Sequence, residues 1–184
     1  VELHNEKMDA SFSVGDLYLG KVKKLIPSLN AAFVDIGYGK DAFLHYTDLS
    51  PYIRSIIKFT QQSINNNQAE IDFSSFIVEP EIVKTGKINE ILVGKPNLLV
   101  QISKEPIASK GPRLSCELSL PGRFIVLTPF NDIVAISKKI HSADERKRLQ
   151  NIIESIKPKN LGVIVRTAAE GQKTAELHED LMSL

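Results

Sequence analysis

The alternation of apolar and polar residues is clearest between residues 30 and 49. Two short runs there are separated by a glycine-containing turn at residues 37–39, and both alternate with the period of two that is typical of β-strands. One face of each predicted strand is entirely apolar and suits a core. The other face carries Phe33 on the first strand, and Phe43 and His45 on the second, among polar neighbours.

These exposed rings have two interpretations. Every nucleic-acid base has a π-face, so aromatic side chains among polar residues provide a stacking platform that contributes ~1–3 kcal/mol for each base. Alternatively, Phe33 and Phe43 pack beneath a neighbouring loop or domain. The alternation is compatible with both.

Further segments on either side of this hairpin also have clear patterns. Strands are predicted over residues 17–26 and 98–103, and helical spacing of apolar residues predicts a short helix over residues 50–57. The polar, low-complexity residues 61–68 predict a mobile loop, within an insertion that we place at residues 60–87. Four to five short strands with Gly and Pro between them predict a small closed barrel of the OB type.

The pattern changes in the second half of the chain. Apolar runs at residues 124–127, 133–136 and 163–165 are continuous, which is typical of strands buried on both faces of a sheet that helices cover. A capping box at Ser142–Glu145 predicts the start of a helix. A second helix is expected over residues 176–184, so this half predicts an incomplete α/β segment.

Composition narrows the class of protein. Of the 184 residues, 42% are hydrophobic and 24% are charged, as in ordinary soluble globular proteins. The apolar runs are far shorter than the roughly 20 residues that span a bilayer, and the polar start contains no signal peptide. One cysteine excludes an internal disulfide and predicts no zinc cluster. We therefore expect a cytoplasmic protein without a membrane span.

Charge is unevenly distributed, although the net charge is only +1. Residues 104–173 contain 13 Lys and Arg against 7 Asp and Glu. A basic region of this kind suits a polyanion such as nucleic acid. The alternative is a solvated surface that is basic by composition.

Candidate chemistry is concentrated where one predicted strand ends. Residues 163–165 lead directly into Arg166 and Thr167, followed by small residues and Gly171. An Arg fork beside a hydroxyl is a good phosphate clamp, because the guanidinium pairs with two phosphate oxygens and the hydroxyl adds a donor. The alternative is a surface arginine in an ordinary strand-to-helix turn.

Two weaker motifs point in the same direction. Gly122, in the sequence SLPGRF, would let backbone approach a ligand closely, although Pro-Gly is also a simple turn. The basic loop at residues 109–113 suits contacts with a nucleic-acid backbone. The carboxylates are dispersed, and there is no Walker loop, dinucleotide fingerprint or nucleophile elbow. The residues therefore predict an RNA- or DNA-binding module with no catalytic residue and no metal ligand in this chain.

Four blocks of sequence occur together in an order that resembles the N-terminal part of the ribonuclease E/G family. They are GKVKKLIPSLNAAFVDIGYGKDAFL (residues 20–44), SKGPRLSCELSLPGRFIVLTP (109–129), ISKKI (136–140) and GVIVRTAAEG (162–171). The first part is especially similar to ribonuclease G of the Bacteroidetes type.

The resemblance implies a mainly β chain with an α/β part. Residues 1–11 would be a remnant of an RNase H-like subdomain. Residues 12–116 would form an S1-type OB-fold RNA-binding barrel, including the insertion at 60–87. Residues 117–184 would form a truncated sensor for the RNA 5′ end.

Eight residues match positions that bind RNA in this family. The RNA contacts of the barrel fall on Phe33, Phe43 and Lys110, with His45 as a weaker match. The family's 5′-monophosphate pocket falls on Arg166 and Thr167, and is completed by Gly122 and Val126.

For the parent protein, the resemblance implies a single-strand-specific, Mg²⁺-dependent endoribonuclease of rRNA processing and mRNA decay. It is expected to be a homo-oligomer that binds single-stranded RNA. The Mg²⁺ ligands and a possible zinc link would lie beyond Leu184, so we expect this chain to bind RNA without cutting it. Two other hypotheses remain open: a non-catalytic OB-fold RNA-binding adaptor, and a structural domain whose aromatic residues mediate subunit contacts.

Overall fold

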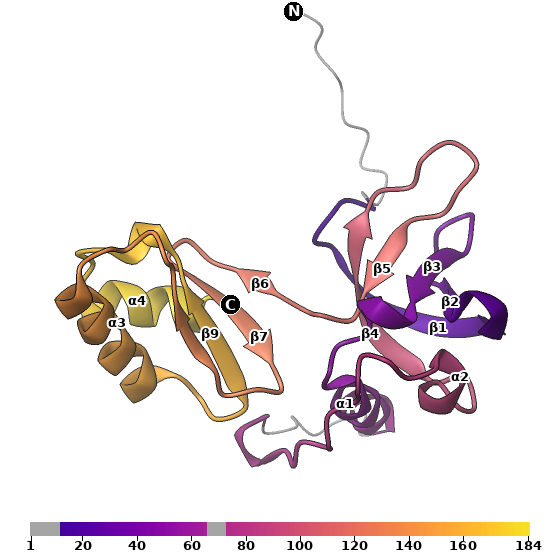
Figure 1. Cartoon of the computed structure of the whole chain (residues 1–184), viewed down its shortest axis with the longest axis horizontal. Coiled ribbons are helices and arrows are strands. Elements are labelled where there is room, and N and C mark those ends of the chain that lie inside the picture. The colour runs from indigo at the N-terminus through magenta and orange to yellow at the C-terminus, as the bar shows by residue number, and fades with distance from the viewer. Residues whose placement is uncertain (1–11, 66–72) are drawn as a thin grey trace, which may run out of the picture. The chain divides into compact units, whose positions relative to one another are not determined.

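A computed structural model describes residues 12–65 and 73–184, which divide into two compact units. Of these described residues, the first unit contains 12–49 and 84–116, and the second contains 50–65, 73–83 and 117–184 (Figure 1). The predicted remnant at residues 1–11 lies outside the described residues.

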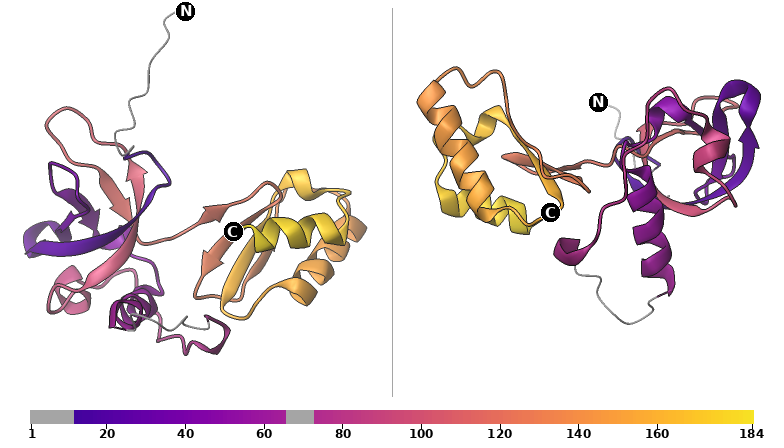
Figure 2. Two further views of the ribbon diagram at one scale, coloured as in Figure 1. Left: turned by 180° about the vertical axis from the view of Figure 1, so that it is seen from behind. Right: turned by 60° about the horizontal axis from the view of Figure 1, so that its bottom comes forward.

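The first unit is a closed five-stranded barrel with the strand order β1-β2-β3-β5-β4 (Figure 2). All neighbouring pairs are antiparallel except β3 and β5, which close the barrel in parallel. The small closed barrel predicted from the sequence is therefore confirmed. The strands are β1 (Leu17–Ile26), β2 (Ala31–Asp35), β3 (Ala42–His45), β4 (Asn97–Lys104) and β5 (Arg113–Ser115).

The hairpin of β2 and β3 has the predicted alternation. Ala32, Val34 and Leu44 are fully buried in the barrel. Phe33 lies directly opposite Phe43 in the register, and both are only half-buried. The hairpin therefore directs its phenylalanine pair away from the barrel core.

Short helical turns complete the barrel unit. A contact between distant segments comes from Asn30, whose side chain donates to the Gly86 carbonyl (3.0 Å) and accepts from the Ile88 amide (2.8 Å). The side-chain amide of Asn30 therefore holds the segment before β4 against the start of β2. The short elements are η1 (Pro27–Leu29), η2 (Tyr46–Asp48) and α2 (Ile88–Ile91).

The second unit contains a four-stranded sheet with the order β6-β7-β9-β8. β7 and β9 are antiparallel, whereas β8 and β9 are parallel. The strands of the sheet and the helical elements that follow them along the chain are β6 (Leu120–Pro121), β7 (Ile125–Pro129), β8 (Val134–Ile136), α3 (Ala143–Ile156), β9 (Leu161–Val165), η4 (Thr167–Ala169) and α4 (Thr174–Met182).

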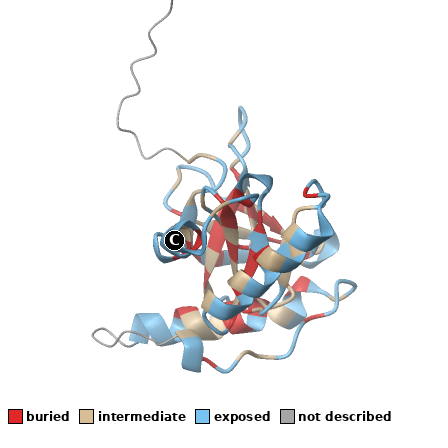
Figure 3. Ribbon diagram, turned by 90° about the vertical axis from the view of Figure 1, so that its left-hand side faces the viewer, coloured by how far each residue is buried: buried red, intermediate tan, exposed pale blue. Residues whose placement is uncertain are grey.

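Only one face of this sheet is a core. Leu149 and Ile153 of α3, together with Leu177 of α4, pack in one buried cluster with alternate residues of β7 and β9. The intervening row faces the other way, and its Ile164 is 43% exposed. Figure 3 shows buried residues in red along the strands and exposed residues in pale blue over much of the helices. The prediction of strands buried on both faces was therefore wrong, because α3 and α4 pack against the same side of the sheet.

The start of α3 agrees with the sequence. The Ser142 hydroxyl accepts a hydrogen bond from the Glu145 amide (3.3 Å), which is the expected N-cap. The helix ends at Ile156, and Leu149 and Ile153 form its buried stripe.

Helix α1 (Ile53–Asn65) is longer than predicted and begins later. The helix continues through residues 61–65, which the polar composition had indicated to be a loop; residues 66–68 of that predicted loop lie outside the described residues. This part of the helix is exposed, so polar residues are compatible with it. The Thr60 and Ser63 hydroxyls donate to carbonyls one turn earlier, which places these side chains on the helix instead of in a turn.

Four phenylalanines form an aromatic cluster in the second unit. Their ring centroids lie between 5.0 and 6.4 Å apart, and Phe130 is almost fully buried. The described part of the predicted insertion, up to residue 83, groups with this unit. The cluster consists of Phe59 from α1, Phe73 from η3 (Phe73–Ser75), Phe76 and Phe130.

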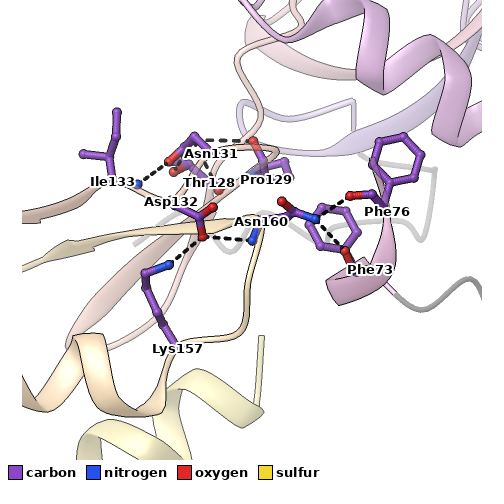
Figure 4. Close-up of polar contacts among 9 residues, drawn as sticks. All are labelled: Phe73, Phe76, Thr128, Pro129, Asn131, Asp132, Ile133, Lys157 and Asn160. Carbon is purple, nitrogen blue, oxygen red and sulfur yellow. Dashed lines mark hydrogen bonds and ion pairs between the residues drawn. The ribbon is translucent and has the colours of Figure 1, made fainter. Parts of the chain in front are cut away.

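Asn160 connects the segment around η3 to the sheet (Figure 4). Its buried side-chain amide donates to the carbonyls of Phe73 (3.0 Å) and Phe76 (2.7 Å). Its own backbone amide donates to Asp132 (2.9 Å), which also accepts from Lys157. Lys157 and this amide lower the pKa of the Asp132 carboxyl.

Replacing Asn160 with alanine should destabilise the second unit. The change removes one hydrogen-bond donor from the Phe76 carbonyl and one from the Phe73 carbonyl, which keeps the Phe76 amide (3.3 Å). The loss costs about 1–3 kcal/mol, and alanine at the positive φ of 64° is strained by about 1–2 kcal/mol more. Asn160→Gly is the matched control, because glycine tolerates that φ and loses only the amide. Urea unfolding followed by circular dichroism measures both variants. Wild-type stability in Asn160→Gly would contradict the assigned role of the amide.

Candidate nucleic-acid interface

An open pocket of about 740 Å³ lies on the barrel unit, against the β2–β3 hairpin. Aromatic and basic side chains line it together. The lining includes Phe33, Phe43, Lys40, Lys104, Lys110 and Arg113. Three of the four residues predicted for RNA binding thus come together in one pocket, and the fourth, His45, lies beside it.

The aromatic residues form a continuous row along the hairpin. The ring centroids of Phe33 and Phe43 are 6.1 Å apart with an interplanar angle of 67°, an edge-to-face arrangement. The ring of His45 follows Phe43 at 6.5 Å and is nearly parallel to it, at 28°. All three rings lie at the barrel surface, so the row offers their π-faces and edges to a ligand.

The orientation of His45 is fixed by the chain that follows it. Its Nδ1 accepts a hydrogen bond from the Thr47 backbone amide (3.2 Å) and lies 2.7 Å from the Thr47 hydroxyl. Because Nδ1 is an acceptor here, the proton of the neutral ring is on Nε2. His45 therefore acts as the N-cap of η2 and holds one end of the aromatic row.

The basic side chains at the pocket differ in how far they are already paired. Arg113 donates to both carboxylate oxygens of Asp48 (2.9 and 3.2 Å). Lys40 donates to the Ala108 carbonyl (2.9 Å), a neutral group, so this contact does not neutralise the charge of the lysine. Lys104 and Lys110 are exposed at the rim. The positive charges of these lysines favour the binding of an anion in the pocket.

The loop that carries Lys110 is held close to the hairpin. The Phe43 amide donates to the Pro112 carbonyl (2.8 Å). A Cβ on Gly111 would lie 2.1 Å from the Asp41 carbonyl oxygen, so only glycine fits at this approach. Residues 109–113, which the sequence indicated to be a basic loop, are not all loop, because Arg113 begins β5 and pairs with Phe43.

Asp35 and Asp41, at the ends of the β2–β3 turn, share one cation. Lys23 contacts the carboxylates of Asp35 (3.3 Å) and Asp41 (2.8 Å). The Gly37 amide and then Lys23 lower the pKa of the Asp35 carboxyl. Lys23 thereby offsets the negative charge that Asp41 brings to the pocket lining.

The four residues predicted to bind a 5′-phosphate lie in the second unit. Arg166 follows β9, and its Nη1 donates to the Gly122 carbonyl (2.6 Å). The Thr167 hydroxyl lies 3.2 Å from the hydroxyl of Ser137, and Val126 is half-buried on β7. Arg166 and Thr167 are both exposed. The structure thus brings Arg166 and Gly122 into contact.

Three residues of α3 that the sequence did not assign to the site support the loop after β9 or its neighbour Ser137. The Glu145 carboxylate accepts from the Gly171 amide (2.8 Å) and from two nitrogens of Arg148 (both 2.7 Å). Arg148 and then the Gly171 amide lower the pKa of Glu145 to about 2. Arg146 donates to the Ser137 carbonyl (2.7 Å) and so supports the partner of Thr167. The capping motif at Ser142–Glu145 predicted the start of a helix but none of these contacts.

Nothing in the described residues resembles a metal centre. No three His, Cys, Asp or Glu side chains there are grouped so that they could hold a metal ion. Cys116 is fully buried, and burial raises the pKa of its thiol, so the thiolate nucleophile is disfavoured. Within the same residues, no helix combines the length and the apolar character needed to cross a membrane.

Comparison with known proteins agrees with the sequence blocks. Residues 119–184 match the model of the Ribonuclease E/G family. The chain is 35% identical over 179 residues to Ribonuclease G of Escherichia coli (strain K12), which is 97% of this chain and 33% of that protein. It is 38% identical over 169 residues to Ribonuclease E of Nostoc sp., 91% of this chain and 21% of that protein.

A second Ribonuclease E, from Synechocystis sp., is 36% identical over 175 residues, 95% of this chain and 22% of that protein. The chain therefore spans a third or less of the length of these relatives. Both described units lie within the similarity to ribonucleases G and E, and the second unit also contains the match to the family model. By these matches, the chain is similar over most of its length to ribonucleases G and E, and its residues 119–184 match the model of the Ribonuclease E/G family.

Proposed function

We propose that this chain is the RNA-binding and 5′-monophosphate-sensing portion of a ribonuclease G-type endoribonuclease. The whole protein would cut single-stranded RNA in rRNA processing and mRNA decay. The observation that carries the proposal is the pocket in which Phe33 and Phe43 lie beside Lys104 and Lys110. The names of the similar proteins, Ribonuclease G and Ribonuclease E, support RNA as the ligand.

The position of the pocket on the barrel supports an S1-type OB fold. OB folds bind oligonucleotides on the face of strands 2 and 3 and on the loop between strands 4 and 5. Phe33 lies on β2, Phe43 lies on β3, and Lys110 lies in the loop between β4 and β5. The positions of the aromatic row and of Lys110 on these elements support a binding surface for single strands on this part of the barrel.

In the proposed complex, unpaired bases stack on Phe33 and Phe43 while the lysines contact phosphates. Stacking requires bases that are free of a duplex, which gives the preference for single-stranded RNA. It tolerates different base sequences, because every base offers a π-face. Lys104 and Lys110 add charge contacts that do not depend on base identity.

The second unit would bind the 5′ end through Arg166 and Thr167. One guanidinium nitrogen of Arg166 already donates to Gly122, and this contact orients the group. The remaining N–H groups are available for phosphate oxygens, and the neighbouring Thr167 hydroxyl adds another donor. A terminal monophosphate suits this pair of donors, whereas a 5′-hydroxyl end has no negatively charged group for them to bind.

Cleavage would belong to the whole protein. We propose Mg²⁺ for that reaction, and a homo-oligomer with a possible zinc link for its assembly. The described residues do not provide a ligand group for either metal. The residues of this chain would therefore bind and position the strand, and no step of the cleavage reaction is assigned to them.

Photo-crosslinking tests the RNA-binding surface. A short unstructured RNA that contains 5-iodouridine is irradiated with the wild-type chain, and the adducts are mapped by mass spectrometry. We expect adducts at Phe33 and Phe43, since they stack on bases. A duplex of the same sequence is the control and should give far fewer adducts. Efficient crosslinking of the single strand exclusively at other residues would contradict the proposal.

A further inference from the structure

The turn between β6 and β7 is closed by a carboxylate from another element. Three successive backbone amides, those of Arg123, Phe124 and Ile125, donate to the carboxylate of Asp180 on α4. The three distances are 2.9, 2.8 and 3.0 Å. The turn also contains its own hydrogen bond, from the Gly122 amide to the Ile125 carbonyl (2.8 Å).

Gly122 makes room for this carboxylate. A Cβ at Gly122 would lie 2.7 and 2.9 Å from the two carboxylate oxygens of Asp180. The glycine of the SLPGRF sequence predicted that backbone at Gly122 approaches a ligand closely. In the structure, the group that approaches it is an internal carboxylate.

The same turn supports Arg166 at two points. The Arg166 backbone amide donates to the Phe124 carbonyl (2.8 Å), and its Nη1 donates to the Gly122 carbonyl (2.6 Å). Asp180 and Arg166 therefore bind the same short turn, Asp180 through its amides and Arg166 through its carbonyls. A shift of the turn would move the guanidinium with it.

We propose that Asp180 is a positioning residue of the 5′-phosphate clamp, which fixes the turn that orients the Arg166 guanidinium. The inference rests on the proposed function of Arg166 as a phosphate ligand. It deepens that function by adding a residue from α4 that would not itself touch the phosphate. Neither the spacing of the sequence motifs nor the family resemblance pointed to Asp180.

The chemistry of the contact requires a carboxylate. Its two oxygens accept three N–H groups, whereas an asparagine amide has one acceptor oxygen and an NH₂ group that cannot accept from a backbone N–H. Asp180→Asn therefore removes at least one of the three hydrogen bonds while it keeps the size of the side chain. Glu179→Gln, on the same helix, removes the same charge and leaves the three contacts in place.

The test compares the affinities for one short RNA with a 5′-monophosphate or a 5′-hydroxyl end. We expect Asp180→Asn to lower the preference for the monophosphate about tenfold. Its affinity for the 5′-hydroxyl RNA should match that of wild type, and Glu179→Gln should keep the full preference. Methyl NMR signals of Val163 and Leu177, which lie in the core of the second unit, should stay at their wild-type positions. Unchanged signals would show that the unit is folded, so that a lost preference reflects a displaced Arg166 guanidinium.

Two further variants make the outcomes distinguishable. If Arg166→Ala keeps the wild-type preference, the proposed clamp fails, and the role of Asp180 fails with it. If Arg166→Ala loses the preference while folded Asp180→Asn keeps it, only the inference on Asp180 is overturned. If Asp180→Asn does not fold, Gly122→Ala tests the same contact from the other partner, because its Cβ displaces the carboxylate. A wild-type preference in Gly122→Ala would then overturn the inference.

Discussion

Replacing Phe33 with alanine is expected to weaken the binding of a short, unstructured A/U-rich RNA about 5- to 150-fold. The estimate follows from the ~1–3 kcal/mol that one base gains by stacking on an aromatic ring. Phe33 lies opposite Phe43 in the hairpin and lines the pocket, so its ring is available without rearrangement of the barrel. Fluorescence anisotropy of a labelled RNA measures the change.

Two substitutions at the same position separate stacking from packing. Phe33→Tyr keeps an aromatic face and should bind within about threefold of wild type, because the π-face carries the interaction. Phe33→Leu keeps an apolar side chain but has no π-face, and should resemble Phe33→Ala. Equal RNA affinity of the Tyr and Leu variants would show that Phe33 supports the barrel or a protein contact instead of stacking on a base.

Reversing the charge of Arg166 should remove the preference for 5′-monophosphorylated RNA. Arg166→Glu replaces a guanidinium donor with a carboxylate that repels the terminal phosphate. We expect the relative affinity for the monophosphate to fall about 10- to 100-fold, as for the loss of hydrogen bonds to a charged group. Binding of the 5′-hydroxyl RNA, which depends on the barrel pocket, should stay close to wild type. Anisotropy titrations with both RNAs measure the ratio.

Lys147→Glu is the matched control for that change. Lys147 is exposed on α3 in the same unit, so its reversal alters the net charge equally without touching the contact between Arg166 and Gly122. It should preserve the ratio of the two affinities. Equal losses for both RNA ends in Arg166→Glu would contradict a role in 5′ sensing, because the charge would then act only through general attraction.

The parts of the fold that the sequence predicted well depend on local signals. Alternation and a glycine-containing turn defined the β2–β3 hairpin, and they placed Phe33 and Phe43 on its outer face. Ser142 and the apolar stripe after it defined α3. In each case, neighbouring residues determine the conformation, so one segment of sequence contains the relevant information.

One prediction that failed misread a local pattern, and another depends on contacts between distant segments. The polar residues at the end of α1 indicated a loop, yet the helix continues through residues 61–65 because an exposed helical face accepts polar side chains. The run that contains Ile164 suggested burial on both faces. Helices α3 and α4 pack on the other side of the sheet, and no property of the strand itself specifies where they lie.

The candidate sites show the same limit. Family resemblance named Gly122 and Arg166 separately, but their contact joins residues 44 positions apart. The carboxylate of Asp180 reaches backbone amides more than 50 positions earlier, and its place near the chain's last residues gave no sign of this. Similarly, the closeness of Lys110 to Phe43 follows from the pairing of β3 with β5, which local patterns do not reveal.

The central claim is that the barrel pocket binds the backbone and bases of single-stranded RNA. The most direct test is to titrate the wild-type chain with 5′-monophosphorylated RNA at low and at high salt. With about three lysine–phosphate contacts, affinity should fall about 20-fold between roughly 50 and 200 mM salt, since those contacts release counterions. Absence of binding, or binding that salt does not change, would contradict the account.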